Sequence, residues 1–325
     1  MSASVSISPA QEKFTAEPHE SILNAALRAG LALDYGCSNG TCGRCKARLL
    51  QGNVTPLQHF DYRFSEAEKS QGYILTCACA ADTNIKLEAR LANDSEDMPY
   101  QTLLARVRKY EMLSDEILYL RLRTPRTQRL RFLAGQQVLL TLNEDLPPIQ
   151  LPVASCPCDG MQLEFHVRRN KANPTIEFLY ENITLNDAIG VSGPTGNFIF
   201  DEGDTRALFL FAYDTGFAAI RSLTEHIVSR ELAQPIQLFW LTPDFPPYAH
   251  NYCRSVSDAI DNISYATVQA DEAYIEEALQ AELASFKSKH GDIQIYAAAT
   301  QRVINIIQPP LSRYAADALH VDITL

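Results

Sequence analysis

The hydrophobic pattern of the first ninety residues predicts a small unit of mixed strands and helix. Val5 and Ile7 alternate with serines, which is typical of a short strand. Ser21 precedes apolar residues at helical spacing and Gly30 follows them, so we expect a helix capped by Ser21 and ended at Gly30. Further strands are expected at 46–50 and 85–90. A loop rich in glycine and cysteine accompanies them, which indicates an α+β unit built around something that the cysteines hold.

Residues 100–200 contain short apolar runs separated by turn residues. The predicted strands are 103–107, 117–122, 138–142, 163–167 and 188–192. Even spacing of short strands favours an antiparallel barrel or sandwich.

The pattern changes again in residues 205–325. Ala207–Tyr213 is a continuous apolar run, as in a strand buried on both faces, and Gly216–Ser229 follows with helical periodicity. Further strands are expected at 236–242, 265–268, 293–298 and 321–325. Alternation of strands and helices predicts a parallel sheet covered by helices, so the whole chain is expected to be a multidomain α+β and α/β protein.

Length and charge narrow the class of protein. A chain of 325 residues suggests two or three domains. Its 28 basic and 39 acidic residues give a net charge of −11, which argues against general nucleic-acid binding. Residues 1–93 are neutral and the whole excess lies in 94–325, and this shift predicts a domain boundary. The polar stretch 93–99 is interpreted as a linker.

The sequence also predicts the cellular setting. No run approaches the roughly 20 apolar residues of a membrane span, and the start has no basic and apolar segments of a secretory signal. A cytoplasmic protein without a membrane span is expected. Its eight cysteines are therefore expected to be reduced, metal-bound or buried rather than paired as disulfides.

Cysteine spacing carries the strongest chemical signal. Cys37, Cys42 and Cys45 form a C-x4-C-x2-C loop, and Cys77 follows after 31 intervening residues, an arrangement typical of plant-type [2Fe–2S] ligation. Glycines at 36, 40 and 43 allow positive φ angles and a close approach of backbone N–H groups to sulfur. A structural zinc site is the alternative, although its usual signature is two CxxC pairs. Cys79 is the alternative fourth ligand; otherwise it is a small buried residue.

The motifs resemble a known family. Residues 1–92 resemble a plant-type ferredoxin domain, and the whole chain resembles the three-domain NAD(P)H-dependent reductase components of bacterial multicomponent oxygenases. The resemblance implies a β-grasp [2Fe–2S] domain at 1–93, a linker at 94–99, a flavin-type β-barrel at 100–203 and an NAD(P)-type α/β domain at 204–325. In that family a hydride passes from NAD(P)H to FAD, and single electrons then pass through the cluster to an oxygenase.

The family's flavin motif, R-x-Y-[ST], is missing here. Ile149, Leu151 and Pro152 stand at its three positions, so the charge, the aromatic face and the hydroxyl are all absent. The neighbouring sequence still resembles that of the family. The positions that the resemblance implies for flavin contacts are His166 and Val167, in the segment LEFHVRR, and Thr175 on the phosphate side.

The nicotinamide motifs are also missing. The G-G-T-G loop is replaced by Tyr213-Asp214-Thr215-Gly216, which leaves Thr215 and Gly216 as the family positions for cofactor binding. Asp214 adds negative charge where a pyrophosphate would come. The later C-G-P-P becomes Ala298-Ala299-Thr300-Gln301. These losses predict that FAD, NAD(P)H or both no longer bind as in the family; a flavin held by other contacts is the alternative.

Three functions follow from the sequence. The first is an iron–sulfur electron-transfer protein that passes single electrons to a redox partner, an oxygenase or another metalloenzyme. The second is a complete NAD(P)H- and FAD-dependent reductase with unusual cofactor contacts. The third is a pseudo-reductase acting as a binding or regulatory subunit. The family is one of oxidoreductases, but with these motifs missing the sequence assigns no catalytic residue.

Other features have simpler interpretations. Cys156-Pro157-Cys158 predicts an ordinary turn, and Cys253 a packed apolar residue. The run 121–131 holds five arginines, for which a solvated strand face is favoured over a docking patch for an acidic partner or a nucleotide phosphate. The acidic stretch 271–282 predicts the solvated face of a helix.

Overall fold

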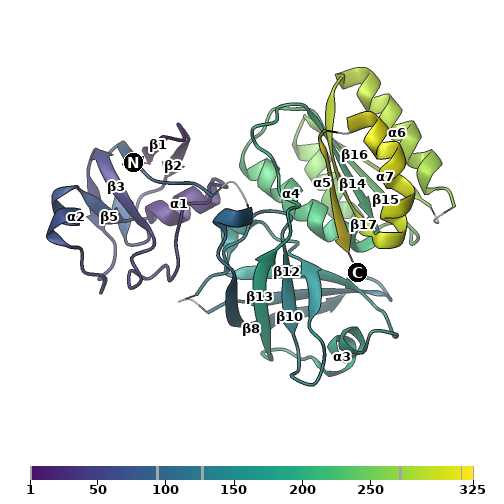
Figure 1. The fold of residues 1–325 in the computed structure, drawn as a ribbon, viewed down its shortest axis with the longest axis horizontal. Coiled ribbons are helices and arrows are strands. Elements are labelled where there is room, and N and C mark those ends of the chain that lie inside the picture. The colour runs from purple at the N-terminus through teal and green to yellow at the C-terminus, as the bar shows by residue number, and fades with distance from the viewer. Residues whose placement is uncertain (1, 93–94, 126–127, 271–272, 316, 325) are drawn as a thin grey trace.

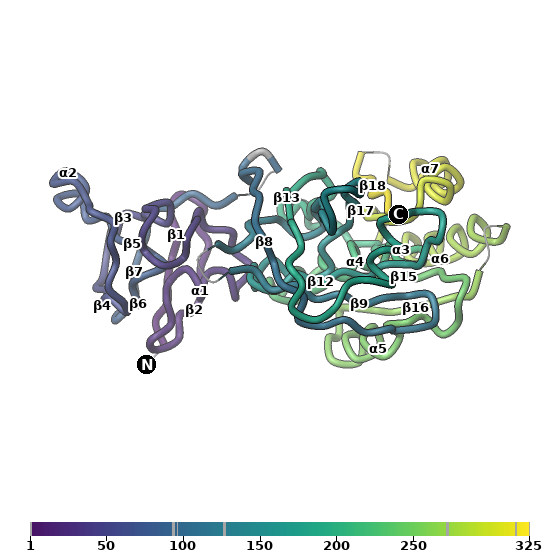
Figure 2. The backbone as a smooth tube through the Cα atoms, turned by 90° about the horizontal axis from the view of Figure 1, so that it is seen from below, coloured from purple at the N-terminus to yellow at the C-terminus, as the bar shows by residue number. Residues whose placement is uncertain are grey.

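The computed structural model describes residues 2–92, 95–125, 128–270, 273–315 and 317–324. The chain is elongated, with an N-terminal unit at one end and two larger bodies packed together at the other (Figures 1 and 2). Three main sheets, one in each body, form in chain order. This confirms the predicted multidomain α+β and α/β class.

The N-terminal unit is a five-stranded mixed sheet with a helix packed on it. The strand order is β2-β1-β7-β3-β5, and the neighbours β1 and β7 run parallel. The strands are β1 (Ala3–Ser8), β2 (Lys13–Ala16), β3 (Lys46–Gln51), β5 (Tyr73–Leu75) and β7 (Ile85–Glu88), with β4 (Val54–Pro56) and β6 (Cys79–Ala81) paired beside them. The short α2 (Glu66–Ser70) precedes β5.

The helix α1 (Ile22–Arg28) forms as its sequence predicts. The Ser21 Oγ accepts a hydrogen bond from the backbone N–H of Asn24, which satisfies one of the free donors at the helix start. Its apolar face is buried, including Ile22 and Leu23 at 0% exposure. Gly30 adopts a φ of +73° just beyond the end of the helix, a conformation that glycine enters without a Cβ clash.

The middle body is a nearly closed antiparallel barrel. Its strand order is β11-β10-β13-β8-β9-β12, and the first and last strands approach each other. The strands are β8 (Gln101–Met112), β9 (Ile117–Arg123), β10 (Gln137–Thr141), β11 (Ile149–Pro152), β12 (Gln162–Arg168) and β13 (Ala188–Thr195). All five predicted strands are present. The periodicity did not predict β11 or the helix α3 (Pro174–Asn182), because each is short and bounded by proline.

The C-terminal body is a parallel sheet between two layers of helices. The strand order is β16-β15-β14-β17-β18. The strands are β14 (Ala207–Tyr213), β15 (Ile236–Thr242), β16 (Ile263–Gln269), β17 (Ile293–Thr300) and β18 (Leu319–Thr324). One core joins the sheet to α4 (Phe217–Ser229) and α5 (His250–Ala259), and the other joins it to α6 (Ile275–His290) and α7 (Gln301–Ala315). The predicted strand at 321–325 therefore begins earlier, and its last residue lies outside the described ones.

Short 3₁₀ helices connect these elements. They are η1 (Ser95–Asp97), η2 (Pro157–Asp159) and η3 (Asp214–Gly216). η1 falls within the predicted linker 94–99, whose first residue is not among the described ones. The predicted acidic stretch 271–282 likewise begins outside the described residues. From Ile275 on, that stretch lies in α6, where Glu276 and Glu277 are exposed as expected.

Part of the arginine run lies between bodies rather than on a free face. Arg131 is 5% exposed and pairs with Asp34 at 2.5 Å, and Arg129 donates to Asn24. On the other side of this junction, Arg230 of the C-terminal body pairs with Glu12. On β9, Arg121 is half-buried and Arg123 is exposed. The predicted solvated strand face therefore describes this part of the run only.

No helix among the described residues has the length and apolar character needed to cross a bilayer.

Candidate iron–sulfur centre and reductase cleft

The loop between α1 and β3 holds three cysteines close to the molecular surface. Cys37 and Cys42 are tied reciprocally: the backbone N–H of each donates to the Sγ of the other at 3.3 Å. The N–H of Thr41 also donates to Cys37 Sγ at 3.3 Å. Burial would raise the pKa of Cys37, but these and neighbouring hydrogen bonds outweigh burial and lower it to about 6. The loop therefore favours a thiolate, the form that binds iron.

The other two cysteines form a second pair. Cys45 is the residue immediately before β3, and Cys77 lies just after β5. Their Sγ atoms lie 3.1 Å apart. The hydrogen bond between the two sulfur atoms lowers the pKa of Cys45 and raises that of Cys77. The backbone holds this pair in register, because Thr76 N–H donates to the carbonyl of Cys45.

The two-plus-two grouping distinguishes the two kinds of metal centre considered. Among the described residues, no three side chains of His, Cys, Asp or Glu converge as a single metal ion requires. A mononuclear zinc site needs four thiolates around one point, whereas a two-iron cluster takes two thiolates on each iron. The donor set therefore fits a [2Fe–2S] group better than zinc. Cys79 is 4% exposed on β6 and is a buried residue, as expected for the simpler interpretation.

Glycines shape the loop in two ways. Gly43 has a φ of +73° and Gly40 one of +82°, as predicted, and a Cβ on Gly43 would lie 2.1 Å from the Tyr62 ring. The prediction of positive φ is wrong for Gly36, whose backbone is ordinary. There the requirement is space, since a Cβ would sit 3.0 Å from Cys42 Sγ.

We expect Gly43→Ala to reduce the iron content of the purified protein. The added methyl group collides with Tyr62, and the loop must shift away from the geometry that places Cys42 and Cys45. Gly196→Ala is the matched control, because Gly196 has a φ of +92° with nothing within 4 Å of a Cβ. Both variants carry the left-handed strain of about 1–2 kcal/mol. Equal iron content in the two proteins would show that the contact with Tyr62 does not matter.

The predicted flavin and nicotinamide positions meet at one cleft between the barrel and the C-terminal sheet. His166, Val167 and Thr215 line it together with Leu151 and Pro152. The remaining lining residues are Arg168, Ile176 and Thr324. Thr175 and Gly216 adjoin these residues in the chain. The family positions are thus brought together, but the space between them is a cavity of only about 10 Å³.

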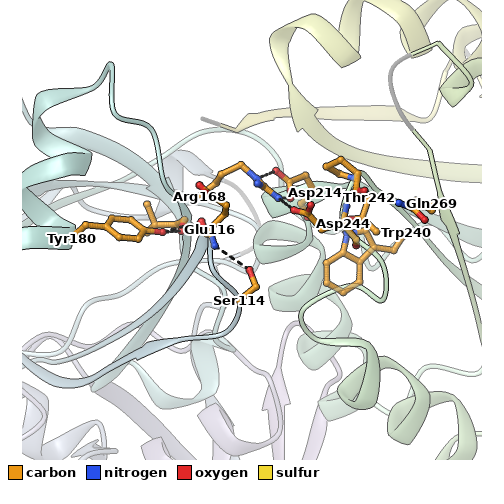
Figure 3. Close-up of polar contacts among 11 residues, drawn as sticks. Ser114, Glu116, Arg168, Tyr180, Asp214, Trp240, Thr242, Asp244 and Gln269 are labelled. Carbon is orange, nitrogen blue, oxygen red and sulfur yellow. Dashed lines mark hydrogen bonds and ion pairs between the residues drawn. The ribbon is translucent and has the colours of Figure 1, made fainter.

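Ion pairs close this cleft. Arg168, at the end of β12, extends from the barrel to the C-terminal body (Figure 3). Its guanidinium donates through Nη2 to Asp214 at 2.8 Å and to Asp244 at 2.6 Å, and its Nε also contacts Asp214. Asp214 is 5% exposed, and its carbonyl accepts from the Trp240 indole at 3.1 Å. A second tie runs from Gln137 of β10 to Asp322 and to the carbonyl of Ile323 on β18.

His166, Val167 and Thr175 each have a hydrogen-bond partner within the protein. The His166 ring contacts the Tyr248 hydroxyl at 3.0 Å and Arg221 at 3.2 Å; burial, and then the charge of Arg221, lowers its pKa to about 3, so it stays neutral. The Val167 carbonyl accepts from Tyr180, and the Thr175 hydroxyl donates to the carbonyl of Pro147. Thr215 is 4% exposed.

The loop that should carry a dinucleotide instead packs against the sheet. A Cβ on Gly216 would lie 2.0 Å from the carbonyl oxygen of Ala298. The missing side chain therefore allows backbone to approach backbone rather than a cofactor.

Comparison with known proteins now places the chain. Residues 5–82 match the family model described as "2Fe-2S iron-sulfur cluster binding domain". The chain joins a [2Fe–2S] ferredoxin domain to a reductase module. It is 28% identical over 258 residues to the CDP-6-deoxy-L-threo-D-glycero-4-hexulose-3-dehydrase reductase of Yersinia pestis, covering 79% of this chain and 76% of that protein. It is 27% identical to the toluate 1,2-dioxygenase electron transfer component of Pseudomonas putida, covering 85% and 83%.

The reductase fold extends over the full chain. A solved ferredoxin reductase of carbazole 1,9a-dioxygenase superposes with a TM-score of 0.58 at 22% identity, covering 100% of this chain and 99% of that one. Kinship with these reductases implies FAD and NAD(P)H for the module. The residues present do not fit that implication: a cavity of about 10 Å³ has room for one water molecule at most.

The structure corrects one expectation about the cysteines. Cys156 and Cys158 form a disulfide across Pro157, where reduced thiols were expected; the expected turn is present as η2. The 3₁₀ turn η2 brings the two Cα atoms to 5.2 Å, within the range for such a bond. Cys253 is fully buried as predicted.

Asp322 gives the cleft a pH dependence. Burial raises its pKa to about 7, with the bond from Gln137 opposing, so the folded chain holds a proton that the unfolded chain loses near pH 4. Stability therefore falls as pH rises from about 4 through 7. We expect Asp322→Asn to be more stable than wild type at pH 8, by up to about 4 kcal/mol, with the difference fading toward pH 4. Urea denaturation across this range measures it, and parallel pH profiles for the two proteins would contradict it.

Proposed function

We propose that the protein is an iron–sulfur electron carrier that passes single electrons to a partner redox enzyme. The observation that supports this most is the arrangement of four cysteine sulfurs as two pairs at the edge of the N-terminal sheet. When bound there, a plant-type [2Fe–2S] group supplies one-electron chemistry near about −400 mV.

We assign the ligands as Cys37 with Cys42, and Cys45 with Cys77. Backbone N–H groups of the loop point at the sulfurs of Cys37 and Cys42, which offsets negative charge there. Cys42 is exposed and Cys37 half-exposed, whereas Cys45 and Cys77 are buried. The exposed pair supports electron exchange with a docked protein on this side of the domain. We also retain the division at 1–93, 94–99, 100–203 and 204–325 as a proposal.

The partner class is an oxygenase or a similar metalloenzyme. This rests on relatives that are named as the reductase component of terephthalate 1,2-dioxygenase and the electron transfer component of toluate 1,2-dioxygenase. Within this chain, the described residues show no Ser-His-Asp arrangement at the cleft that would suggest a separate hydrolytic activity, and the buried His166 is neutral and fully hydrogen-bonded.

A transfer assay tests the function. The protein is reduced anaerobically with dithionite, freed from excess reductant on a desalting column, and mixed with cytochrome c as a one-electron acceptor. We expect rapid cytochrome reduction together with return of the oxidised visible spectrum. Protein that carries its full iron content but reduces no cytochrome above the level of a Cys77→Ala variant would contradict the function.

A further inference from the structure

We propose that the barrel and the C-terminal sheet form a closed body that binds no flavin, and that the centre at the four cysteines receives its electrons from a separate redox protein. The second half of this proposal rests on the proposed function.

The cleft has too little space for a flavin. His166 and Val167, together with Leu151 and Pro152 at two positions of the missing motif, line a cavity of only about 10 Å³. The three fused rings of a flavin need far more than the volume of a single water molecule. Leu151 and Pro152, at the aromatic and hydroxyl positions of the family motif, are both buried at this cavity.

The charges at the cleft also oppose a flavin nucleotide. Ile149 supplies no cation for a pyrophosphate and is 3% exposed in the barrel core. Arg168 is the cation at the cleft, and it is already bound by Asp214 and Asp244. A flavin nucleotide entering here would have to break these pairs and bring its phosphates toward two carboxylates, which repel them.

The barrel and the C-terminal body are held together around the cleft as well as across it. The Ser222 hydroxyl of α4 donates to the carbonyl of Ser155 at 3.0 Å. Arg221, one residue earlier, pairs with Glu164 of β12 at 2.8 Å. Opening the cleft for a flavin would therefore break several buried polar contacts at once.

A larger cavity of about 650 Å³ elsewhere does not replace the cleft. It lies where the ferredoxin domain meets the other two bodies. Its lining includes the acidic residues Glu12, Asp201 and Glu202. Its arginine, Arg131, is paired with Asp34. This balance of charge disfavours a diphosphate.

The chemical consequence concerns the electron source. NAD(P)H gives up a hydride, which carries two electrons, and a flavin normally divides these into single steps. Without a flavin in the chain, the donor must itself release one electron at a time. The donor's reduced centre then loses one electron and the [2Fe–2S] group gains one, with no bond or proton transferred. A separate flavoprotein reductase has the required chemistry.

Flavin measurements on the full-length protein test the first half. After anaerobic purification, acid denaturation is expected to release far less than one flavin per chain. Titration with excess FAD is expected to cause no saturable quenching of flavin fluorescence. Stoichiometric flavin in the first measurement, or saturable binding in the second, would overturn the closed cleft.

Reduction measurements test the second half. NADH or NADPH alone is expected to leave the visible bands unchanged, whereas NADPH with a catalytic amount of a purified ferredoxin–NADP⁺ reductase bleaches them. Bleaching by NAD(P)H alone, or bleaching by dithionite but not by the added reductase, would overturn the proposal. Iron content is measured in parallel, so a protein without the cluster would refute the proposed function while the flavin measurements still decide the cleft.

Discussion

Cys77→Ala is expected to abolish iron retention, whereas Cys79→Ala leaves it intact. The two residues are two positions apart, both are buried, and both lose the same sulfur atom, so packing effects are matched. Only Cys77 contacts another cysteine sulfur, with Cys45 Sγ at 3.1 Å. Because binding of the metal group contributes directly to the folding energy of such a domain, the loss should also lower the stability of the N-terminal unit.

Iron and sulfide analysis, with the visible spectrum, measures this first prediction. The expected pattern is a nearly colourless Cys77→Ala protein and a Cys79→Ala protein that matches wild type. The reverse pattern would make Cys79, rather than Cys77, the fourth ligand. Iron in both variants would refute the four-cysteine assignment. The alternative ligand Cys79 is thereby tested within the same experiment.

Arg168→Ala is expected to destabilise the two-domain reductase body strongly. The substitution leaves the Asp214 carboxylate, whose side chain is 7% exposed, without its guanidinium partner. Removing one partner of a buried pair costs about 3–5 kcal/mol. For a body of this size, that loss lowers the melting temperature by roughly 10 °C.

Two further variants separate this explanation from a general effect of losing an arginine. Arg169→Ala removes the next residue, which pairs with Glu177 on the surface of the barrel, and should change the melting temperature little. Asp214→Gly in the Arg168→Ala background removes the unpaired charge and also the positive φ of +52° at a residue with a side chain. That double variant should recover most of the stability. If the double variant has the same melting temperature as the Arg168→Ala protein, loss of the ion pair does not account for the loss of stability.

Local sequence patterns were sufficient to predict the architecture and to single out the cysteine loop as the candidate site. The Ser21 cap, the alternating Val5 and Ile7, and the continuous apolar run of Ala207–Tyr213 each act over a few residues, so their signals are visible without a structure. The cysteine loop is similar, because three of its four proposed ligands lie within nine residues.

The cleft was predictable only in part. Asp214 could be identified as a charge in the wrong place for a pyrophosphate, but its partner could not. Arg168 lies 46 residues from Asp214 and 76 from Asp244 in sequence, and such a pairing follows from how two bodies pack. The same holds for Gln137 and Asp322, which are 185 residues apart. The Cys156–Cys158 disulfide was missed for a different reason: the short turn geometry outweighed the expectation from cellular compartment.

The central claim is that four cysteine sulfurs bind a two-iron group. Metal and sulfide analysis of anaerobically purified full-length protein, combined with electron paramagnetic resonance after dithionite reduction, tests it most directly. We expect two irons and two inorganic sulfides per chain and a signal from one unpaired electron in the reduced protein. A single iron or zinc per chain, or protein that retains no iron under anaerobic conditions, would contradict it.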